Sequence, residues 1–543
     1  MVFALSALAY FCAVLSRRRQ TARTPDGIGA QEMAVATRCV VNVDLVDVWA
    51  DAGRKKFLRT LGWGDEVSVK KITSSAVEIE TVVYEAALDG SITPNKLPGF
   101  IVPTRSSGFK PADVVIKAAN NEVLRVNFID VQQGDGAVIE TPDGKLILVD
   151  GGDNQLFARY LAGRFRGTSA AKPKDVDCIL VTHGDADHFE GLPRIFDSET
   201  HPEPKKRLFI RPHRVYHNGI VKRPGTRNKK RVPEKELLGP TAKLGDSLYL
   251  VGLETDLLKV PDADMNAPFL KWKKALAAYN KRRKIVFRRL ELGDTKAFSF
   301  FNQGSLNIEV LGPITETVAG KTGLKFLGDP PKGPRMGHES LAQEDLDSKG
   351  FSASHTINGH SIVFKLNYGG FSYLFSGDLN DEASRFLARE HNKGTVNLRS
   401  EVFKVPHHGS ADFSGAFVQA ISPVVSVVSS GDENARKEYI HPRATLMGAL
   451  GKHSRVAEPL IFVTELVAFF TYEKLVQNVD PQVARKRGAF HGFSRAAFGL
   501  VKTRTDGRRL LIYTDSANVK MKEAYAYQLD DSGQPTPSVV VRV

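Results

Sequence analysis

Histidine and aspartate residues gather in one short stretch of the sequence, Thr182 to His188. The stretch follows an apolar run from Val176 that predicts a buried strand. Imidazole and carboxylate groups are ligands for divalent metals such as zinc, and a tight loop after a strand can aim several of them at one point. The pattern therefore predicts a metal site rather than an acidic surface turn, with enough ligands for two ions: His183, Asp185, Asp187 and His188.

Aspartate or histidine also follows three further apolar strands that lie far away in the sequence. Asp378, the pair His407 and His408, and His441 each stand in a turn directly after such a strand. Active-site groups gather at strand ends in layered α/β folds. We therefore expect these four pieces of chain to converge on one centre.

These pieces together resemble the metallo-β-lactamase-fold hydrolases. Within them, the sequence is most similar to the soluble domain of the ComEC/Rec2 DNA-uptake proteins and their free-standing relatives. The resemblance covers about residues 123 to 455. The matching pieces are Phe128 to Asp135, Val149 to Gly152, His183 to His188, Gly377 with Asp378, His407 to Ser410, Gly431 with Asn434, and Tyr439 to Pro442.

The resemblance implies an αββα sandwich with a dinuclear metal site. In that pattern His183 and Asp185 hold one ion, Asp187 and His188 hold the other, and Asp378 bridges both. A histidine of the His407–His408 pair completes the second ion. Asp135 and Asp150 are expected to orient the ligands from behind, which also influences metal affinity.

The sequence departs from the family pattern at two positions. Position 185 is Asp where the wider superfamily usually has His; a carboxylate is a harder ligand, so manganese competes better with zinc, the expected metal. Gln132 stands where Gly is typical, which affects a loop. A third superfamily histidine has three candidates, His355, Asn358 and His360. A lone histidine there is more often structural, and His360 is the one we carry forward as a metal ligand.

Two metals can bind a hydroxide between them and polarise an ester oxygen. The sequence therefore predicts a metal-dependent hydrolase, foremost a phosphodiesterase or nuclease, with a metal-bridging hydroxide held by Asp378. Asp187 belongs to the same catalytic group. His408 or His441 is the candidate proton donor to the leaving group, and packing against Pro442 is an equally supported role for His441.

The net charge of +14 comes from one region of the chain. Lys205 to Lys235 carries a net +11 and Lys271 to Arg289 a net +9, so the remainder is acidic. A focused positive field attracts polyanions such as nucleic acid, whereas a solvated insertion is the alternative. Aromatic residues lie among these charges, and we favour burial for Trp272. The candidate nucleic-acid contacts are Lys229, Lys230, Arg231, Lys281, Arg282 and Arg283.

Two other functions remain open. The first keeps the fold and hydrolyses a small-molecule ester or phosphoester. The second is a non-catalytic, metal-stabilised module that binds nucleic acid. The aspartate at position 185, where the superfamily usually has histidine, is the feature that supports it. Salt dependence separates the first from a nuclease, because polynucleotide binding weakens steeply with salt. Metal content separates the second from a hydrolase.

The chain has 543 residues, of which 42% are apolar and 25% charged. This balance is typical of a soluble globular protein and excludes a disordered, collagenous or multi-spanning membrane chain. The fold class predicted is α/β (α+β). We expect a lead-in at 1–33, a small β-rich domain at 34–121, the hydrolase domain at 122–455 with a basic insertion at about 199–300, and a mixed, β-containing segment at 456–543.

The N-terminal run from Val2 to Leu15 is apolar and precedes three arginines. It is too short for a confident span, which needs about 20 residues. A short membrane anchor and a start site placed upstream of Met33 are the two interpretations. We expect a cytoplasmic protein without stable membrane insertion, since its three cysteines show no paired spacing. The sequence makes no prediction of oligomeric state.

Overall fold

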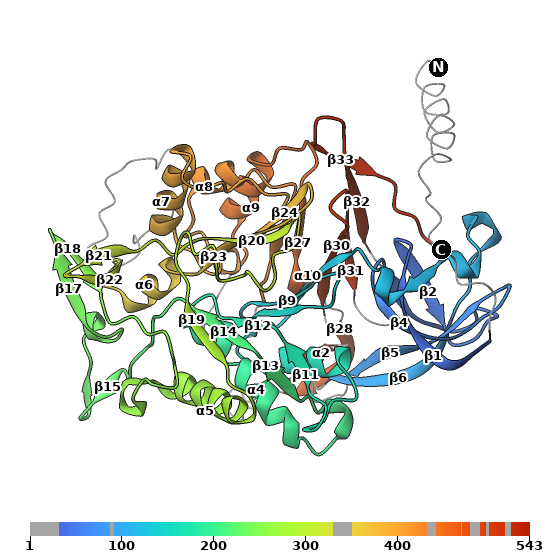
Figure 1. Ribbon diagram of the computed structural model, residues 1–543, viewed down its shortest axis with the longest axis horizontal. Helices are drawn as coiled ribbons and strands as arrows, with labels where there is room; N and C mark the ends of the chain where they lie inside the picture. The colour runs from blue at the N-terminus through green and yellow to red at the C-terminus, as the bar shows by residue number, and fades with distance from the viewer. Residues whose placement is uncertain are drawn as a thin grey trace.

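The computed structural model describes residues 32–86, 92–328, 350–431, 441–467, 470–477, 489–495, 499–515 and 523–543. Apolar runs in the middle of the chain form strands that are covered on both faces, which explains why they show little polar alternation. In β10 (Leu146–Asp150), Leu146 and Leu148 contact one apolar cluster, whereas Ile147 and Val149 contact another on the opposite face. These strands build two stacked sheets (Figure 1).

The larger sheet contains ten strands of the described chain. It has a parallel part, from β10 to β19, and an antiparallel part that runs to the C-terminal strands. In spatial order the strands are β19 (Val286–Arg289), β14 (Arg214–His217), β12 (Cys178–Leu180), β10, β9 (Gly136–Glu140), β8 (Leu124–Ile129), β30 (Leu500–Thr505), β31 (Arg509–Asp515), β32 (Ala524–Leu529) and β33 (Pro535–Ser538).

The second sheet contains six strands among the described residues. Its last four strands are parallel and its first three are antiparallel. In spatial order they are β20 (Leu306–Gly312), β23 (Val363–Tyr368), β24 (Phe371–Phe375), β25 (Val402–Lys404), β26 (Val425–Val428) and β27 (Leu460–Val463).

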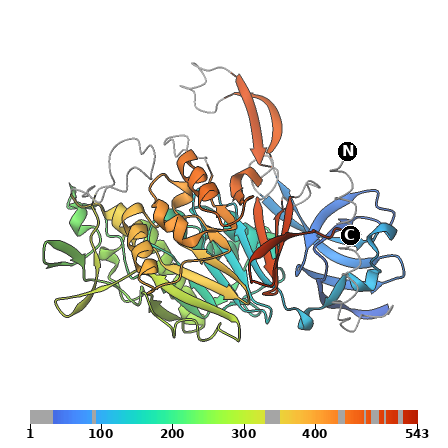
Figure 2. The ribbon, with the colours of Figure 1, turned by 90° about the horizontal axis from the view of Figure 1, so that it is seen from above.

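Helices cover the outer face of each sheet, which makes the predicted αββα sandwich. The larger sheet is covered by α2 (Leu156–Arg164), α4 (Leu192–Asp197) and α5 (Ala267–Arg282). The second sheet is covered by α7 (Asp381–Asn392), α8 (Gly415–Ile421) and α9 (Ala444–Lys452). Between the sheets, rings such as Phe364 and Phe375 stack at 4.5 Å between centroids. Three apolar layers therefore hold four structural layers together (Figures 1 and 2).

The region 199–300, predicted as an insertion, contributes to the core instead. It supplies β14 and β19 to the larger sheet, and α5 packs onto α4 through apolar side chains. Trp272 on α5 is 1% exposed, as predicted. On α5 the lysines and arginines lie away from the buried apolar face, so the net charge of the region did not indicate that the region is part of the core.

The segment 456–543 is also part of the sandwich. β27 extends the second sheet and β30 to β33 extend the larger one beside β8. A boundary at residue 455 therefore does not separate two domains, because strand pairing across it completes both sheets. A hairpin of β28 (Phe470–Gln477) and β29 (Ala489–Arg495) from the same segment stands out from the body (Figure 2).

Seven strands of the N-terminal part form a separate sheet beside the sandwich (Figure 1). This sheet coincides with the β-rich domain expected at 34–121. In spatial order its strands are β3 (Phe57–Gly62), β2 (Leu45–Trp49), β6 (Ile92–Ile101), β5 (Val77–Ala86), β4 (Glu66–Ile72), β1 (Glu32–Val41) and β7 (Val115–Lys117).

Smaller elements connect these parts. The short pair β15 (Thr226–Arg227) and β16 (Lys230–Arg231) is exposed, and β11 (Lys174–Val176) pairs with β13 (Ile210–Pro212). A four-stranded sheet joins β17 (Thr241–Leu244), β18 (Ser247–Leu250), β22 (Lys321–Lys325) and β21 (Glu316–Val318). The remaining short helices are α3 (Ala186–Phe189), α6 (Ala353–Gly359) and α10 (Thr464–Val467).

The apolar run from Val2 to Leu15, for which a short membrane anchor was one of two interpretations, and Cys12 lie outside the described residues. Within the described ranges, no helix has the length and apolar character that crossing a membrane requires. Cys39 and Cys178 are buried and free.

Candidate metal centre

The centre lies where the parallel strands of both sheets end. Asp150 is the last residue of β10, and the loop after β12 leads to His183 and then into α3, which carries Asp187 and His188. From the second sheet, Asp378 follows β24 and His408 follows β25. Carboxyl ends of parallel strands meet at one edge, so two sheets bring residues more than 200 positions apart to one point.

Four side chains form a cage, which we define as Asp187, His188, Asp378 and His408. Their ligand atoms all lie within 4.8 Å of one another. The Nε2 atom of His188 is 3.1 Å from Asp378 Oδ1, and that of His408 is 3.2 Å from Asp378 Oδ2. The His408 Nε2 atom is also 3.3 Å from Asp187 Oδ2. One carboxylate, that of Asp378, therefore lies between two imidazoles from different sheets.

The cage has the donor set and the burial of a divalent metal site. His188, Asp378 and His408 are at most 2% exposed. Among the described residues, the Nε2 atoms of both histidines and Oδ1 of Asp378 are buried without a hydrogen-bond partner. Buried polar atoms are rarely left without a partner, and two carboxylates with two imidazoles suit zinc or manganese. The residues of the cage thus fit a metal ion.

Asp150 orients His188 from behind the cage. Its Oδ2 atom lies 2.9 Å from His188 Nδ1 and also accepts the Thr182 hydroxyl at 2.7 Å, while Oδ1 accepts the Thr182 backbone N–H. A carboxylate that accepts the Nδ1 proton leaves Nε2 available as a ligand. Asp150 has φ of 56°, a left-handed conformation that is uncommon outside glycine. These contacts place Asp150 behind His188, and its orienting role stays a prediction.

His408 is oriented in the same way from the second sheet. Its Nδ1 atom donates to the carbonyl of Ser429 at 3.0 Å and lies 3.5 Å from Asp135 Oδ1. Asp135 is in turn paired with the buried ammonium of Lys404 at 2.7 Å. The Nε2 atom of His408 therefore faces the cage, and Asp135 stands behind the ligands as expected.

The close packing behind the cage depends on glycine. Gly377 has φ of 49°, and a Cβ atom added there would lie 2.7 Å from the Ser361 hydroxyl. That hydroxyl accepts the backbone N–H of Asp378 at 3.0 Å. The tight turn thus sets the position of Asp378 relative to its two histidines.

The imidazoles and carboxylates of the cage shift one another's pKa values. Burial by itself lowers the pKa of His188 and of His408, but the facing carboxylates, Asp378 foremost, outweigh burial and raise both well above the usual value. Burial raises the pKa of Asp378, and the same two histidines lower it well below its usual value. In contrast, burial and the neighbouring His188 lower the pKa of His183 to about 3. The negative field of the carboxylates favours a cation in the cage.

The residues predicted for a second ion are arranged differently. The His183 Nε2 atom is buried and lies 3.9 Å from Asp378 Oδ2. Asp185 is paired instead with the ammonium of Lys222 at 3.0 Å. Burial raises the pKa of Asp185, and Lys222 partly offsets this effect. Among the described residues, Asp185 belongs to no group of three metal-ligating side chains.

Two predicted histidines, His407 and His441, lie side by side outside the cage. The ring of His407 is 6.1 Å from that of His441, and neither belongs to the cage. Burial and the neighbouring His407 and His408 lower the pKa of His441 to about 4, so its ring is neutral at pH 7. A neutral ring accepts a proton more readily than it donates one.

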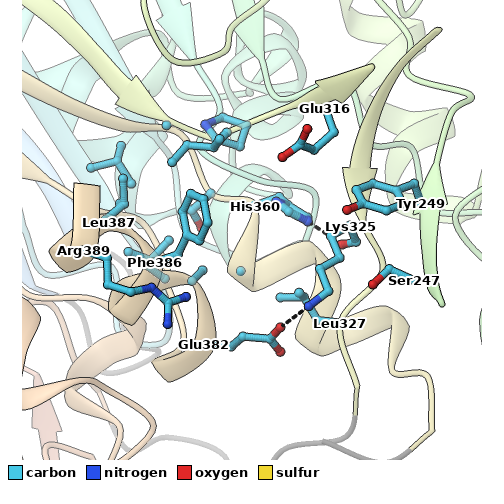
Figure 3. A pocket seen from close by; sticks show the side chains of 18 residues that line it. Ser247, Tyr249, Glu316, Lys325, Leu327, His360, Glu382, Phe386, Leu387 and Arg389 are labelled. Carbon is cyan, nitrogen blue, oxygen red and sulfur yellow. Dashed lines mark hydrogen bonds and ion pairs between the residues drawn. The ribbon is translucent and has the colours of Figure 1, made fainter. Parts of the chain in front are cut away.

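The structure does not support His360 as a ligand. Its Nε2 atom is hydrogen-bonded to the carbonyl of Lys325 at 2.7 Å. The ring lines a separate cavity of about 320 Å³ between β22 and α7 (Figure 3). Shortly before β23, Ser361 is the residue that contacts His183, with its hydroxyl 3.3 Å from His183 Nδ1. The structural role that lone histidines usually have applies here.

The predicted nucleic-acid contacts differ in whether their side chains are exposed or already paired with another residue. Lys229, Lys230 and Arg231 are exposed on the β15–β16 hairpin, where Arg231 reaches Glu234 at 3.3 Å. Arg282 is held by two bonds to Glu199, and its guanidinium lies over Tyr279. That arginine therefore has a structural partner, whereas the hairpin leaves its two lysines open to solvent.

Sequence reasoning missed several residues around the cage. Thr182 and Ser361 contact the orienting groups, and the Gln133 amide donates to Asp187 at 3.2 Å. Lys404 had a detectable signal, because a lysine inside an apolar strand is rarely buried without a partner. Lys222 had none, because its contact with Asp185 joins positions that only the fold brings together.

Comparisons with known proteins agree with this geometry. Residues 129–250 match the model of the metallo-beta-lactamase superfamily. The chain is 33% identical over 98 residues to ComE operon protein 3 of Bacillus subtilis and 36% identical over 97 residues to competence protein ComA of Neisseria gonorrhoeae. Each match covers 18% of this chain, and 12% and 13% of the respective relative.

The matched segment thus spans about an eighth of the length of these curated relatives. The family model's range, residues 129–250, includes β10, β12 and the loop that carries His183 to His188, and the second sheet supplies Asp378 and His408. The chain contains a metallo-β-lactamase-fold domain and is similar, over part of its length, to ComE operon protein 3 and competence protein ComA.

Proposed function

We propose that this protein is a metal-dependent phosphodiesterase, foremost a nuclease. The observation that carries the proposal is the cage of Asp187, His188, Asp378 and His408, in which, within the described ranges, the Nε2 atoms of both histidines and Oδ1 of Asp378 are buried without a hydrogen-bond partner. A divalent ion held there supplies Lewis acidity toward a phosphoryl oxygen and lowers the pKa of water. Zinc and manganese both suit the donor set.

The side chains of the cage have separable tasks. Asp378 presents one oxygen to each of two histidines, so it fixes the distance between the ligands of the two sheets. Asp187 lies at the edge of the cage and is partly exposed, which leaves the opening toward substrate on its side. Asp150 and the Ser429 carbonyl hold the imidazoles in the tautomer that presents Nε2.

The sequence left His408 and His441 as candidate proton donors to the leaving group, and the contacts of each ring now bear on that choice. Both nitrogens of His408 are engaged, one by Ser429 and one by the cage. His441 lies beside His407 with a pKa of about 4, so at neutral pH its ring is uncharged and is a poor proton donor. We therefore propose His408 as a ligand and assign the proton donor to neither ring.

A nucleic acid is the proposed substrate class. The resemblance to DNA-uptake proteins supports it, and the name of one relative, competence protein ComA, refers to competence. The exposed lysines of the β15–β16 hairpin and Lys222 beside the cage offer positive charge to a phosphate backbone.

Activity of the full chain should be screened with zinc and with manganese. The substrates are single-stranded DNA, duplex DNA, RNA, a generic phosphodiester and a carboxylic ester. We expect hydrolysis of a polynucleotide that weakens steeply with salt. Activity confined to the small esters, with little salt dependence, would instead identify a small-molecule hydrolase.

Asp378→Asn should lower the rate by at least about a hundredfold while the chain stays folded, because the amide nitrogen that replaces one carboxylate oxygen cannot bind a metal ion and the negative charge between the two histidines is lost. The exposed Asp531→Asn is the matched control and should keep full activity. Metal-free chain that still binds DNA, with no hydrolysis in any metal, would identify a binding module.

A further inference from the structure

A lysine lies against the position predicted for the second metal ion. The ammonium of Lys222 is 3.0 Å from Asp185 Oδ1. Its backbone is anchored, because its carbonyl accepts the N–H of Asn266 at 2.9 Å and the next N–H donates to Leu237 at 2.8 Å. Val221 before it is buried. The lysine is therefore placed by the fold and is not a long surface side chain that happens to lie near.

The other oxygen of Asp185 is also engaged. In the amide orientation that satisfies its hydrogen bonds, Asn358 donates to Asp185 Oδ2 at 3.0 Å. Asn358 is itself 7% exposed and stands at the end of α6. Both oxygens of the carboxylate thus face N–H donors, one of them positively charged.

The other ligand predicted for this ion is His183. The Nδ1 atom of His183 lies 3.2 Å from the hydroxyl of Thr182 and 3.3 Å from that of Ser361, and Nε2 faces Asp378. Within the described ranges, the two groups of side chains that could hold a metal contain neither His183 nor Asp185. An ion bound between them would lie beside the Lys222 ammonium, and like charges repel strongly in a partly buried site.

We propose that the centre holds one divalent ion, in the cage, and that the ammonium of Lys222 takes the place of the second cation. Lys222 offsets the charge of Asp185 as a metal ion would. This inference rests on the proposed metal-dependent function only in that it takes the cage as the site of the divalent ion. It replaces the two-metal arrangement that the family resemblance implies with a metal–lysine pair.

The test counts metal ions on the full chain. The protein is stripped with a chelator, loaded with excess Mn²⁺ and desalted, and its metal content is measured by mass spectrometry with electron paramagnetic resonance of the bound ion. We expect one ion per chain with the spectrum of an isolated Mn²⁺. Asp185→Asn should also hold one ion. Two ions with a coupled spectrum, falling to one in Asp185→Asn, would overturn the proposal.

A second variant tests the role of the lysine itself. Lys222→Met keeps the length of the side chain and removes the charge, so Asp185 becomes free to bind metal, and we expect a second ion at saturating Mn²⁺. Lys229→Met, on the exposed hairpin, is the matched control and should stay at one. One ion in Lys222→Met would overturn the claim that the ammonium keeps the second ion out.

Folding and function are read separately. Circular dichroism and thermal unfolding establish that each variant is folded before its metal is counted, and Asp187→Asn should lose the single ion. A chain with one ion and no hydrolysis would contradict the proposed function and leave this inference intact. A chain with two ions and full hydrolysis would do the reverse.

Discussion

At the scale of single residues, the centre depends on the side chains behind the ligands as much as on the ligands. Asp150 and the Ser429 carbonyl each bind the Nδ1 side of a cage histidine, so both rings present Nε2. The hydroxyl of Thr182 donates to the Asp150 carboxylate, and the hydroxyl of Ser361 accepts the backbone N–H of Asp378. Both hydroxyls thus fix the positions of the carboxylates. A ligand ring that is free to rotate loses metal affinity even when the ligand atom is unchanged.

Asp150→Asn should therefore weaken metal binding by about 10- to 100-fold. The amide cannot accept the Nδ1 proton of His188 and the Thr182 hydroxyl as the carboxylate does. Titration against a competing chelator measures the affinity, and Asp143→Asn in the turn before β10 is the control. An unchanged affinity with a lower melting temperature would assign Asp150 a structural role alone.

At the scale of elements, the basic region is built as part of the core. α5 carries five of the region's positive charges on its outer face, yet it buries Phe269, Trp272 and Leu276 against α4 and the larger sheet. β14 and β19 on either side of it are strands of that sheet. The long basic side chains thus cover a helix that the sandwich needs.

Trp272→Ala should destabilise the chain by about 3–5 kcal/mol, because it leaves a large cavity under α5. Urea unfolding measures the difference. Lys271→Ala, one position earlier and exposed, is the control and should change the free energy of unfolding by no more than about 0.5 kcal/mol. A loss below about 1 kcal/mol in Trp272→Ala would mean that α5 is not part of the cooperative core.

The β15–β16 hairpin carries the charges that are most open to solvent. Reversal of Lys229, Lys230 and Arg231 to Glu should weaken polyanion binding at least tenfold and reduce its salt dependence, because three phosphate contacts are lost. Fluorescence anisotropy with a labelled oligonucleotide measures both. The metal content should stay unchanged, and unaltered binding would remove the hairpin from the proposed interface.

At the scale of the whole molecule, ion pairs join the N-terminal sheet to the sandwich. Arg504 of β30 binds Asp65 at 2.7 Å, Arg59 of β3 binds Asp515 at 3.1 Å, and Arg125 of β8 binds Glu66 at 3.1 Å. The C-terminal residues also pair with β2 of this sheet. The backbone N–H of Leu45 donates to the carbonyl of Val541, and the N–H of Val543 donates to the carbonyl of Leu45. The last residues of the chain thus lie beside β2 of the N-terminal sheet (Figure 1).

This junction should weaken in acid. Burial by itself raises the pKa of Glu66, but Arg164 and Arg125 outweigh burial and lower it far below the ordinary 4.5. A carboxylate with a lowered folded-state pKa adds stability above its unfolded pKa, and that stability is lost as the pH falls. We expect the melting temperature to drop as the pH falls below about 4.5.

Glu66→Gln should make the melting temperature less dependent on pH in this range and lower it at pH 7. The exposed Glu122→Gln is the control and should follow the parent chain. Parallel pH profiles for the parent and Glu66→Gln would show that Glu66 is not part of the acid response.

The local pattern of the sequence was enough to predict much of the fold and part of the site. Strands β8 to β12, β23 to β26 and helices α2 and α7 follow from apolar runs, turn residues and helical periodicity, which are local properties. The stretch from His183 to His188 is compact, so its ligands needed no long-range contact to be recognised. Asp378 and the pair His407–His408 were expected near the centre from their positions at strand ends.

What only the tertiary structure decided depends on contacts between distant parts of the chain. Strand pairing placed β27 and β30 to β33 in the two sheets, and side-chain direction turned His360 toward Lys325 and Lys222 toward Asp185. A strand signal does not specify its neighbour, and a residue type does not specify its partner. The choice of His408 over His407 has the same origin, because two adjacent rings point in different directions and only one of them meets the other sheet.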